Sequence, residues 1–196
     1  MQRGNLKKYQ SKNPLQRFLI RRFLEAIGEG VRQIPHGPIC EVGCGEGFVL
    51  KNLLEHGMDA RPGVIGVDRD FEALCFASGF AAGAKWTCAS VYELPFRDKQ
   101  FQGLLFLEVM EHLEHPEKAL KEIRRVSRSA LISVPHEPFF KMANFLRGKN
   151  WTRWGNDPEH IQHWGRRSLV RFLESYGRVR SLAAPFPWLV ARVEWD

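Results

Sequence analysis

Three glycines at alternate positions, Gly43, Gly45 and Gly47, separate a short apolar run from an apolar helical pattern. The run at residues 39–42 predicts a buried strand, and the pattern that begins at Phe48 predicts a helix. Glycine has no Cβ, so such a turn lets backbone N–H groups and the positive end of the helix dipole meet a ligand closely. The stretch therefore predicts a ligand-binding turn at the end of a strand.

A second apolar run, at residues 64–67, ends in Asp68. An acid at the tip of the next parallel strand can accept hydrogen bonds from both hydroxyls of a ribose. The spacing of the glycines indicates which nucleotide the turn binds. Dinucleotide-binding folds use G-x-G-x-x-G, whereas this chain has E-x-G-x-G-x-G. That form resembles motif I of the class I S-adenosylmethionine-dependent methyltransferases, and Asp68 resembles their acidic residue after the second strand.

The resemblance implies S-adenosylmethionine as the cofactor, with Glu41 near its methionine amino group and Asp68 on its ribose hydroxyls. The segment S-V-Y-E-L-P-F, residues 90–96, resembles the family's D-A-x-x-L-P-F loop, which lines the adenine. Ser90 stands where many members carry Asp, and a hydroxyl accepts a hydrogen bond more weakly than a carboxylate. The expected cofactor-binding residues are Glu41, Gly43, Cys44, Gly45, Gly47, Asp68, Arg69, Ser90, Val91 and Glu108.

Strands alternate with helices along the chain. The expected strands lie at residues 39–42, 64–67, 86–89, 101–107, 130–134, 179–184 and 189–195. The expected helices lie at residues 14–34, 48–57, 71–80, 108–126 and 166–176. This order predicts an α/β fold, a Rossmann-like doubly wound sheet with helices on both faces. The closing pair of strands predicts an antiparallel edge strand, which matches the family's seven-stranded, mostly parallel sheet.

A length of 196 residues fits a single domain with a full core. We expect residues 1–37 to form a helical segment that flanks the active site and residues 38–196 to form the methyltransferase domain. Within it, a basic and aromatic lid is expected at about 136–165. Such a lid could cover an apolar substrate, contact a membrane interface or stack bases between cations, or its aromatic rings could bury against the sheet.

The formal net charge of +7 indicates either an anionic partner or solvated helix faces. The excess lies at the two ends, from Arg3 to Arg22 and from Lys141 to Arg180. Nucleic acid, an anionic membrane surface and an acidic substrate would each account for it. The four cysteines form no C-x-x-C pair, which favours reduced thiols. With no apolar run of membrane-spanning length and no signal-peptide pattern, the sequence predicts a cytoplasmic protein.

Methyl transfer depends mainly on aligning the acceptor behind the methyl group, but a hydroxyl acceptor must also lose a proton. Glu108, Glu111 and His112 are spaced to share one face at the start of a helix, and His136 follows the fifth strand. We therefore expect His136, Glu111 and His112 to be catalytic.

The pattern E-x-x-E-H-L resembles two groups of methyltransferases. One is the ubiquinone-type O-methyltransferases, and the other methylates the terminal 2′-hydroxyl of small RNAs through a metal held by these residues. No metal is expected here, although Glu108, Glu111, His112 and His163 are candidate ligands if one is bound. In many other members of the superfamily the same pattern is structural.

These observations predict an S-adenosylmethionine-dependent methyltransferase that acts on a small or lipid-linked molecule, with oxygen as the accepting atom. An RNA methyltransferase, with or without a metal, is the alternative within the enzyme class. A cofactor-binding but inactive subunit of a larger complex is the alternative outside it. Nucleic acid is a less favoured partner than a small molecule, and peripheral membrane contact is compatible with the basic ends.

Overall fold

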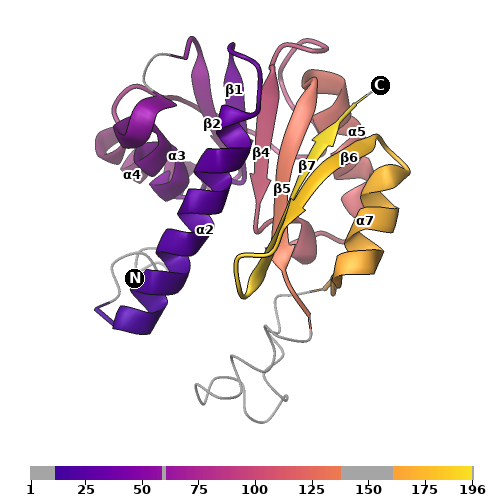
Figure 1. Cartoon of the computed structure of the whole chain (residues 1–196). Helices are drawn as coiled ribbons and strands as arrows, with labels where there is room; N and C mark the ends of the chain where they lie inside the picture. The colour runs from indigo at the N-terminus through magenta and orange to yellow at the C-terminus, as the bar shows by residue number, and fades with distance from the viewer. Residues whose placement is uncertain (1–11, 59–60, 138–160, 196) are drawn as a thin grey trace.

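The computed structural model describes residues 12–58, 61–137 and 161–195, which form a single seven-stranded sheet with helices on both faces (Figure 1). The strands are β1 (Ile39–Val42), β2 (Val64–Asp68), β3 (Lys85–Cys88), β4 (Gly103–Leu107), β5 (Ser129–Pro135), β6 (Arg178–Ala183) and β7 (Trp188–Glu194). The helices are α2 (Pro14–Arg32), α3 (Phe48–Leu53), η1 (Leu54–Met58), α4 (Phe71–Phe80), η2 (Met110–His112), α5 (Pro116–Val126) and α7 (Arg166–Glu174).

The strand order is β3-β2-β1-β4-β5-β7-β6. The first five strands in this order pair in parallel, and β7 runs antiparallel to both β5 and β6. Strands β1, β4 and β5 are buried along their whole length, as expected for parallel strands covered on both faces. The predicted fold class is therefore confirmed.

Two apolar cores lie on opposite faces of the sheet. One is formed with α2 and α3, through residues such as Phe23, Ile27 and Leu50. The other is formed with α5 and α7, through residues such as Leu120 and Leu169. None of the helices in the described parts of the chain has the length and apolarity that a membrane crossing requires.

Helix α2 runs the full height of the sheet and continues past it (Figure 1). Asn13 caps its start, since the side-chain oxygen accepts from the backbone N–H of Leu15 at 2.9 Å. Near its end, a Cβ at Gly30 would lie 2.6 Å from Leu131 in the middle of β5. Phe23 contacts Trp188 at the first position of β7, which pairs with the last position of β5. The residues of α2 before Phe23 therefore extend beyond the carboxyl edge of the sheet.

The stretch after β4 differs from the prediction. Instead of a continuous helix from residue 108, the chain makes one 3-10 turn, η2, and α5 begins at Pro116. Glu108 has a φ of 58°, a left-handed conformation that interrupts helical geometry. Leu113 is extended, and Pro116 occupies the first turn of α5, where a missing N–H costs nothing. The prediction that Glu108, Glu111 and His112 share one helix face was therefore wrong.

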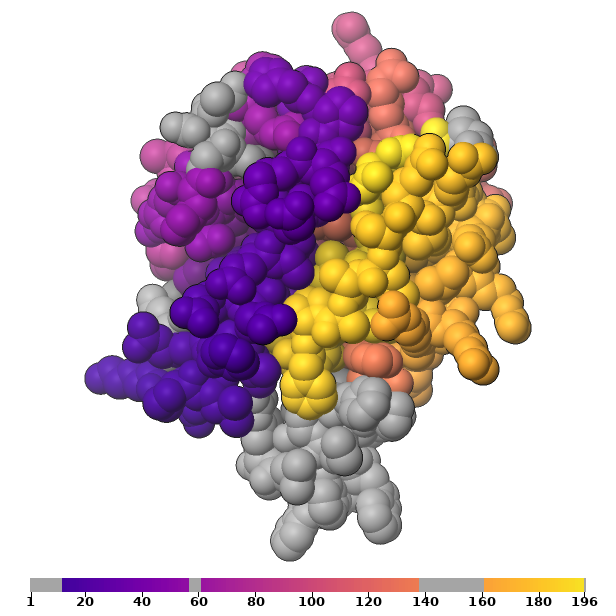
Figure 2. Space-filling view, in the orientation of Figure 1, coloured from indigo at the N-terminus to yellow at the C-terminus, as the bar shows by residue number. Residues whose placement is uncertain are grey.

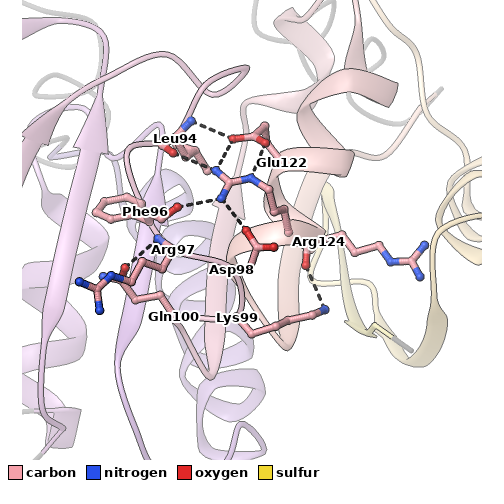
Figure 3. Close-up of polar contacts among 9 residues, drawn as sticks. Leu94, Phe96, Arg97, Asp98, Lys99, Gln100, Glu122 and Arg124 are labelled. Atoms are coloured by element: carbon pink, nitrogen blue, oxygen red, sulfur yellow. Dashed lines mark hydrogen bonds and ion pairs between the residues drawn. The ribbon is translucent and has the colours of Figure 1, made fainter.

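Arg125 of α5 anchors the loop that follows β3 (Figure 3). Its guanidinium donates to the carbonyl oxygens of Leu94 at 2.9 Å and Phe96 at 2.8 Å. It also donates to both carboxylate oxygens of Glu122, at 2.7 and 2.8 Å, and to Asp98 at 3.0 Å. Each N–H group of the Arg125 guanidinium thus donates to an oxygen. These hydrogen bonds hold the L-P-F segment against α5.

Replacing Arg125 with alanine is expected to lower the free energy of unfolding by about 2–3 kcal/mol, because it leaves two backbone carbonyls and Glu122 without their donor. Thermal and urea unfolding measure the change. Lysine at the same position should recover only part of the loss, since it cannot reproduce the fork. Arg124→Ala is the matched control: its exposed side chain points away from the network (Figure 3). Equal effects at the two positions would contradict this account.

Candidate functional site

The glycine turn between β1 and α3 has the geometry that the sequence predicts. Gly43, Gly45 and Gly47 have φ values of 78°, 50° and 76°, a region that other residues adopt only with strain. The backbone N–H groups of Gly43 and Cys44 both donate to Val67 of β2, at 2.8 and 3.0 Å. A Cβ at Gly43 would also collide with Val109. The turn therefore needs glycine both for its conformation and for its close packing.

Asp68 fixes this turn to the end of β2. One carboxylate oxygen accepts the N–H of Gly45 at 2.7 Å, and the other accepts the N–H of Asp70 at 2.9 Å. The side chain is half-buried, so part of the carboxylate still faces the turn. Each carboxylate oxygen has two lone pairs and can accept a further hydrogen bond. Asp68 can thus hold the turn and receive ribose hydroxyls at the same time.

Glu41 is a buried carboxylate below the turn, with 3% of its surface exposed. Burial and, to a smaller degree, the negative charge of Asp68 raise the pKa of Glu41 to about 8. A hydrogen bond from the backbone of Leu50 acts in the opposite direction but does not offset them. Within the described residues, its Oε2 atom has no hydrogen-bond partner. A buried acceptor of this kind fits a cationic group such as the ammonium of an amino-acid moiety.

Cys44 lies in the same turn and is buried. Burial, together with the charges of Glu41 and Asp68, raises the pKa of its thiol. The thiol therefore stays protonated and contributes shape to the turn. Arg69 is exposed at the start of the next loop, where its carbonyl accepts the thiol of Cys88 at 3.6 Å.

Ser90 and Val91 lie just past β3, on the far side of Asp68. The Ser90 hydroxyl oxygen accepts the backbone N–H of Tyr92 at 3.2 Å, which shapes a tight turn closed by the Ser90–Glu93 bridge. Val91 is half-buried against the core. Ala89, the residue before Ser90, donates its backbone N–H to the carbonyl of Asp68 at 3.0 Å, so this segment begins beside Asp68.

Glu108 directly follows β4 and precedes Val109, whose side chain packs against Gly43 of the glycine turn. Its carboxylate accepts the hydroxyl of Ser133 at 3.0 Å and the indole N–H of Trp188 at 2.6 Å. Its own backbone N–H donates to the carbonyl of Ser133 at 3.2 Å. Glu108 therefore joins the end of β4 to β5 and β7, and its carboxylate is directed toward these strands.

The candidate ligands His112 and His163 each lie near a different carboxylate. His112 Nε2 lies 4.0 Å from Glu111 Oε1, and His163 Nδ1 lies 3.8 Å from Glu137 Oε1. Within the parts of the chain that the structure covers, no group of three or more His, Cys, Asp or Glu side chains could hold a metal ion. The structure thus does not bring the candidate ligands Glu108, Glu111, His112 and His163 together.

His136 is half-buried at the end of β5, where its backbone N–H donates to the carbonyl of Pro187 at 2.9 Å. Burial and, to a smaller degree, the positive charge of Arg166 lower the pKa of His136 below its ordinary value. The imidazole is therefore neutral at pH 7 and able to accept a proton. Most of the lid predicted at 136–165 falls at residues 138–160 and lies outside the described residues.

Two tryptophans contribute to the site without any local sequence signal. The Trp86 indole covers the turn, since a Cβ at Gly47 would lie 2.7 Å from it. Trp188 closes the opposite side, where it contacts Phe23 with ring centroids 4.9 Å apart and binds Glu108. Both roles depend on contacts between elements that are distant in sequence, which only the fold reveals.

Fold and site together define a doubly wound α/β protein that binds a nucleotide-like ligand at the glycine turn. Residues 40–130 match the family model for a methyltransferase domain. The chain is 30% identical over 136 residues to uncharacterized protein MJ1123 of Methanocaldococcus jannaschii, an alignment that covers 60% of this chain and 62% of that protein.

Two solved structures share the fold. The magnesium protoporphyrin IX methyltransferase of Synechocystis PCC 6803, with bound SAH, has a TM-score of 0.70 at 14% identity, covering 97% of this chain and 92% of that one. A putative methyltransferase from Haloferax volcanii, in complex with the Trm112 methyltransferase activator, has a TM-score of 0.68 at 13% identity, with both chains fully covered.

These findings support a Rossmann-like methyltransferase domain over residues 40–130, with S-adenosylmethionine as its cofactor. The residues present fit that molecule: the buried Glu41 suits its ammonium group, Asp68 suits its ribose, and the glycine turn leaves room for close approach.

Proposed function

We propose that the protein transfers a methyl group from S-adenosylmethionine to an oxygen atom of a small or lipid-linked acceptor. The observation that supports oxygen is His136, a neutral, half-buried imidazole at the same edge of the sheet as the glycine turn. A hydroxyl is a poor nucleophile until a base receives its proton, whereas many other acceptors need no base. A cytoplasmic location and the free thiols of all four cysteines are compatible with this proposal.

S-adenosylmethionine would supply an electrophilic methyl group on a positively charged sulfur, which would keep the bonding electrons and leave as a neutral thioether. Glu41, after loss of its proton to the solvent, would hold the ammonium, and Asp68 would accept hydrogen bonds from the ribose hydroxyls. His136 receives the acceptor's proton at a ring nitrogen. Trp188 and Phe23 form an apolar wall on the acceptor side, which excludes water.

The test is transfer of labelled methyl from S-adenosylmethionine into fractionated cell extract. We expect label in the solvent-extractable, small-molecule or lipid fraction. Label that appears only in RNA would favour the RNA methyltransferase instead, and label only in protein would also contradict the proposal. Calorimetric binding of the cofactor without any transfer would favour an inactive subunit that requires a partner. The Haloferax volcanii methyltransferase forms a complex with the Trm112 activator.

Replacing His136 with glutamine is expected to lower kcat by about 100-fold or more and leave cofactor affinity unchanged. In the parent protein, the rate should rise with pH as His136 loses its proton and level off before pH 7, because its pKa lies below the ordinary value of 6.5. A pH–rate profile on the purified acceptor measures this.

His115→Gln is the matched control, since it alters an exposed histidine just before α5 that is not a candidate for the site. An equal loss of rate in both variants, or a pH profile unchanged by His136→Gln, would contradict the assignment of the base.

A further inference from the structure

Large apolar side chains that remain exposed are concentrated at one edge of the molecule. Among the described residues they are Leu15, Phe18, Phe71, Phe76, Tyr92, Ile161 and Phe186. Phe71 and Tyr92 follow the carboxyl ends of β2 and β3, and Phe186 lies between β6 and the start of β7. Ile161 donates its N–H to Glu111, just past β4. Leu15 and Phe18 lie on the part of α2 that projects beyond the same edge. Of these seven described residues, Phe76 alone lies away from the carboxyl edge.

Single exposed apolar residues are normal on protein surfaces, but their gathering around one rim is informative. Of the large apolar residues of α2, Leu15 is 59% exposed and Phe18 is 47% exposed. Both lie before Phe23, on the projecting part of the helix described above. Figure 2 shows this part of α2 standing out from the body of the protein at the lower left.

The same part of α2 is strongly basic. Its exposed cations are Lys12, Arg17, Arg21 and Arg22, and no acid precedes Glu25. Arg21 lies 3.5 Å from Glu25, with its guanidinium 5.8 Å from the ring centre of Phe18. Elsewhere on the rim, Phe71 is flanked by the exposed acids Asp70 and Glu72, so cations surround the exposed apolar residues of α2 whereas acids surround Phe71.

A groove of about 1070 Å³ continues from this surface along α2, between α2 and the α3–η1 segment. Apolar residues such as Phe18, Ile20 and Leu53 line it, together with Arg17 and Arg21. A lining that is partly apolar and partly cationic matches an amphiphile with an anionic head.

We propose that the N-terminal half of α2, residues 12–22, docks on an anionic phospholipid surface. Leu15 and Phe18 enter the boundary between headgroups and acyl chains, and the four cations bind the headgroups. An aliphatic side chain as exposed as Leu15 has no stacking role with bases, so these features favour lipid over RNA. Docking would bring the carboxyl edge of the sheet, where the active site lies, to the membrane. The acceptor would then be the lipid-linked one, an inference that rests on the proposed function.

The experiment is cosedimentation of the full chain with vesicles of phosphatidylcholine alone or with about 30% phosphatidylglycerol. We expect binding only to the anionic vesicles, weakened by salt. The double variant Leu15→Glu with Phe18→Glu should lose binding by about tenfold or more, as should Arg17→Glu with Arg22→Glu. Phe76→Glu, at a 41% exposed phenylalanine away from the rim, is the control and should bind like the parent.

Failure of the parent to bind anionic vesicles would overturn the proposal, as would equal binding by the parent and both double variants. Tighter binding to a single-stranded RNA oligonucleotide, lost in the same variants, would assign the surface to RNA instead. Calorimetry with S-adenosylmethionine on the same samples separates the two proposals. A protein that binds cofactor and methylates a water-soluble acceptor, but ignores vesicles, contradicts only the docking surface.

Discussion

Glu41→Gln is expected to stabilise the ligand-free protein above pH 8 while weakening its affinity for S-adenosylmethionine. The carboxyl group of Glu41 holds a proton up to a pKa of about 8 in the folded protein but only to about 4.5 when unfolded. Between these values the folded state binds more protons, so stability falls as pH rises, by roughly 1.4 kcal/mol per pH unit at most. The loss of stability caused by ionising the buried carboxyl group is complete above pH 8 and absent below pH 4.5. The glutamine substitution removes it.

The affinity for S-adenosylmethionine should depend on pH in the opposite direction from the stability. Binding requires the ionised carboxylate, so the affinity of the parent should rise with pH up to about 8 and then level off. The Glu41→Gln variant should bind about 100-fold more weakly at pH 8, with little dependence on pH, because its neutral amide lacks the charge that pairs with the ammonium. Calorimetric titration from about pH 6 to about pH 9, on either side of this pKa, and thermal unfolding of the same samples measure both effects.

Glu55→Gln is the control for these measurements, since Glu55 is an exposed carboxylate of η1. It should change neither the affinity nor the pH dependence of stability. If Glu41→Gln left cofactor affinity intact, Glu41 would not bind the ammonium. If it lowered stability above pH 8, the carboxylate would not carry the burial penalty that its environment implies.

Glu108→Ala is expected to destabilise the protein by about 3 kcal/mol while leaving cofactor affinity nearly unchanged. The substitution removes the acceptor of the Trp188 indole N–H, which is 2.6 Å away, and leaves a buried donor without its partner. It also removes the bond to Ser133 that joins β4 to β5. For a chain of this size, such a loss lowers the Tm by about 6–12 °C.

Two further substitutions at Glu108 distinguish the effect of the lost hydrogen bonds from that of backbone strain. Glu108→Gln keeps an oxygen for Trp188 and should retain most of the stability. Glu108→Gly should be less damaging than alanine, because glycine relieves the strain of a φ of 58° while losing the same hydrogen bonds. Differential scanning calorimetry gives the Tm of each variant. A fall in S-adenosylmethionine affinity as large as that of Glu41→Gln would return Glu108 to the cofactor site, where the sequence had placed it.

The most local features were predictable from the sequence. The strand at 39–42 and the helix at 71–80 have the predicted bounds, and the three glycines form the predicted turn between a strand and a helix. Each depends on residues close together in the chain, so an apolar run, a helix cap or a glycine is sufficient to specify it. The same holds for the pairing of Asp68 with the turn, since parallel neighbours place their carboxyl ends together.

The region after β4 was not predictable in this way. The spacing of Glu108, Glu111 and His112 suits a helix, but the contacts of Glu108 with β5 and β7 hold it in a left-handed conformation instead. Tertiary hydrogen bonds outweighed local helix propensity.

The sequence by itself thus determined the cofactor: E-x-G-x-G-x-G and Asp68 define a ligand through backbone geometry encoded within a few residues. The proposed acceptor side depends on the tertiary structure, because its contacts join residues far apart in the chain. Trp188 reaches Glu108 from the last strand, and α2 carries Leu15 and Phe18 past the edge of the sheet. Burial, and with it the pKa of Glu41, likewise depends on the whole packed fold, because only the surrounding protein removes water from the carboxylate.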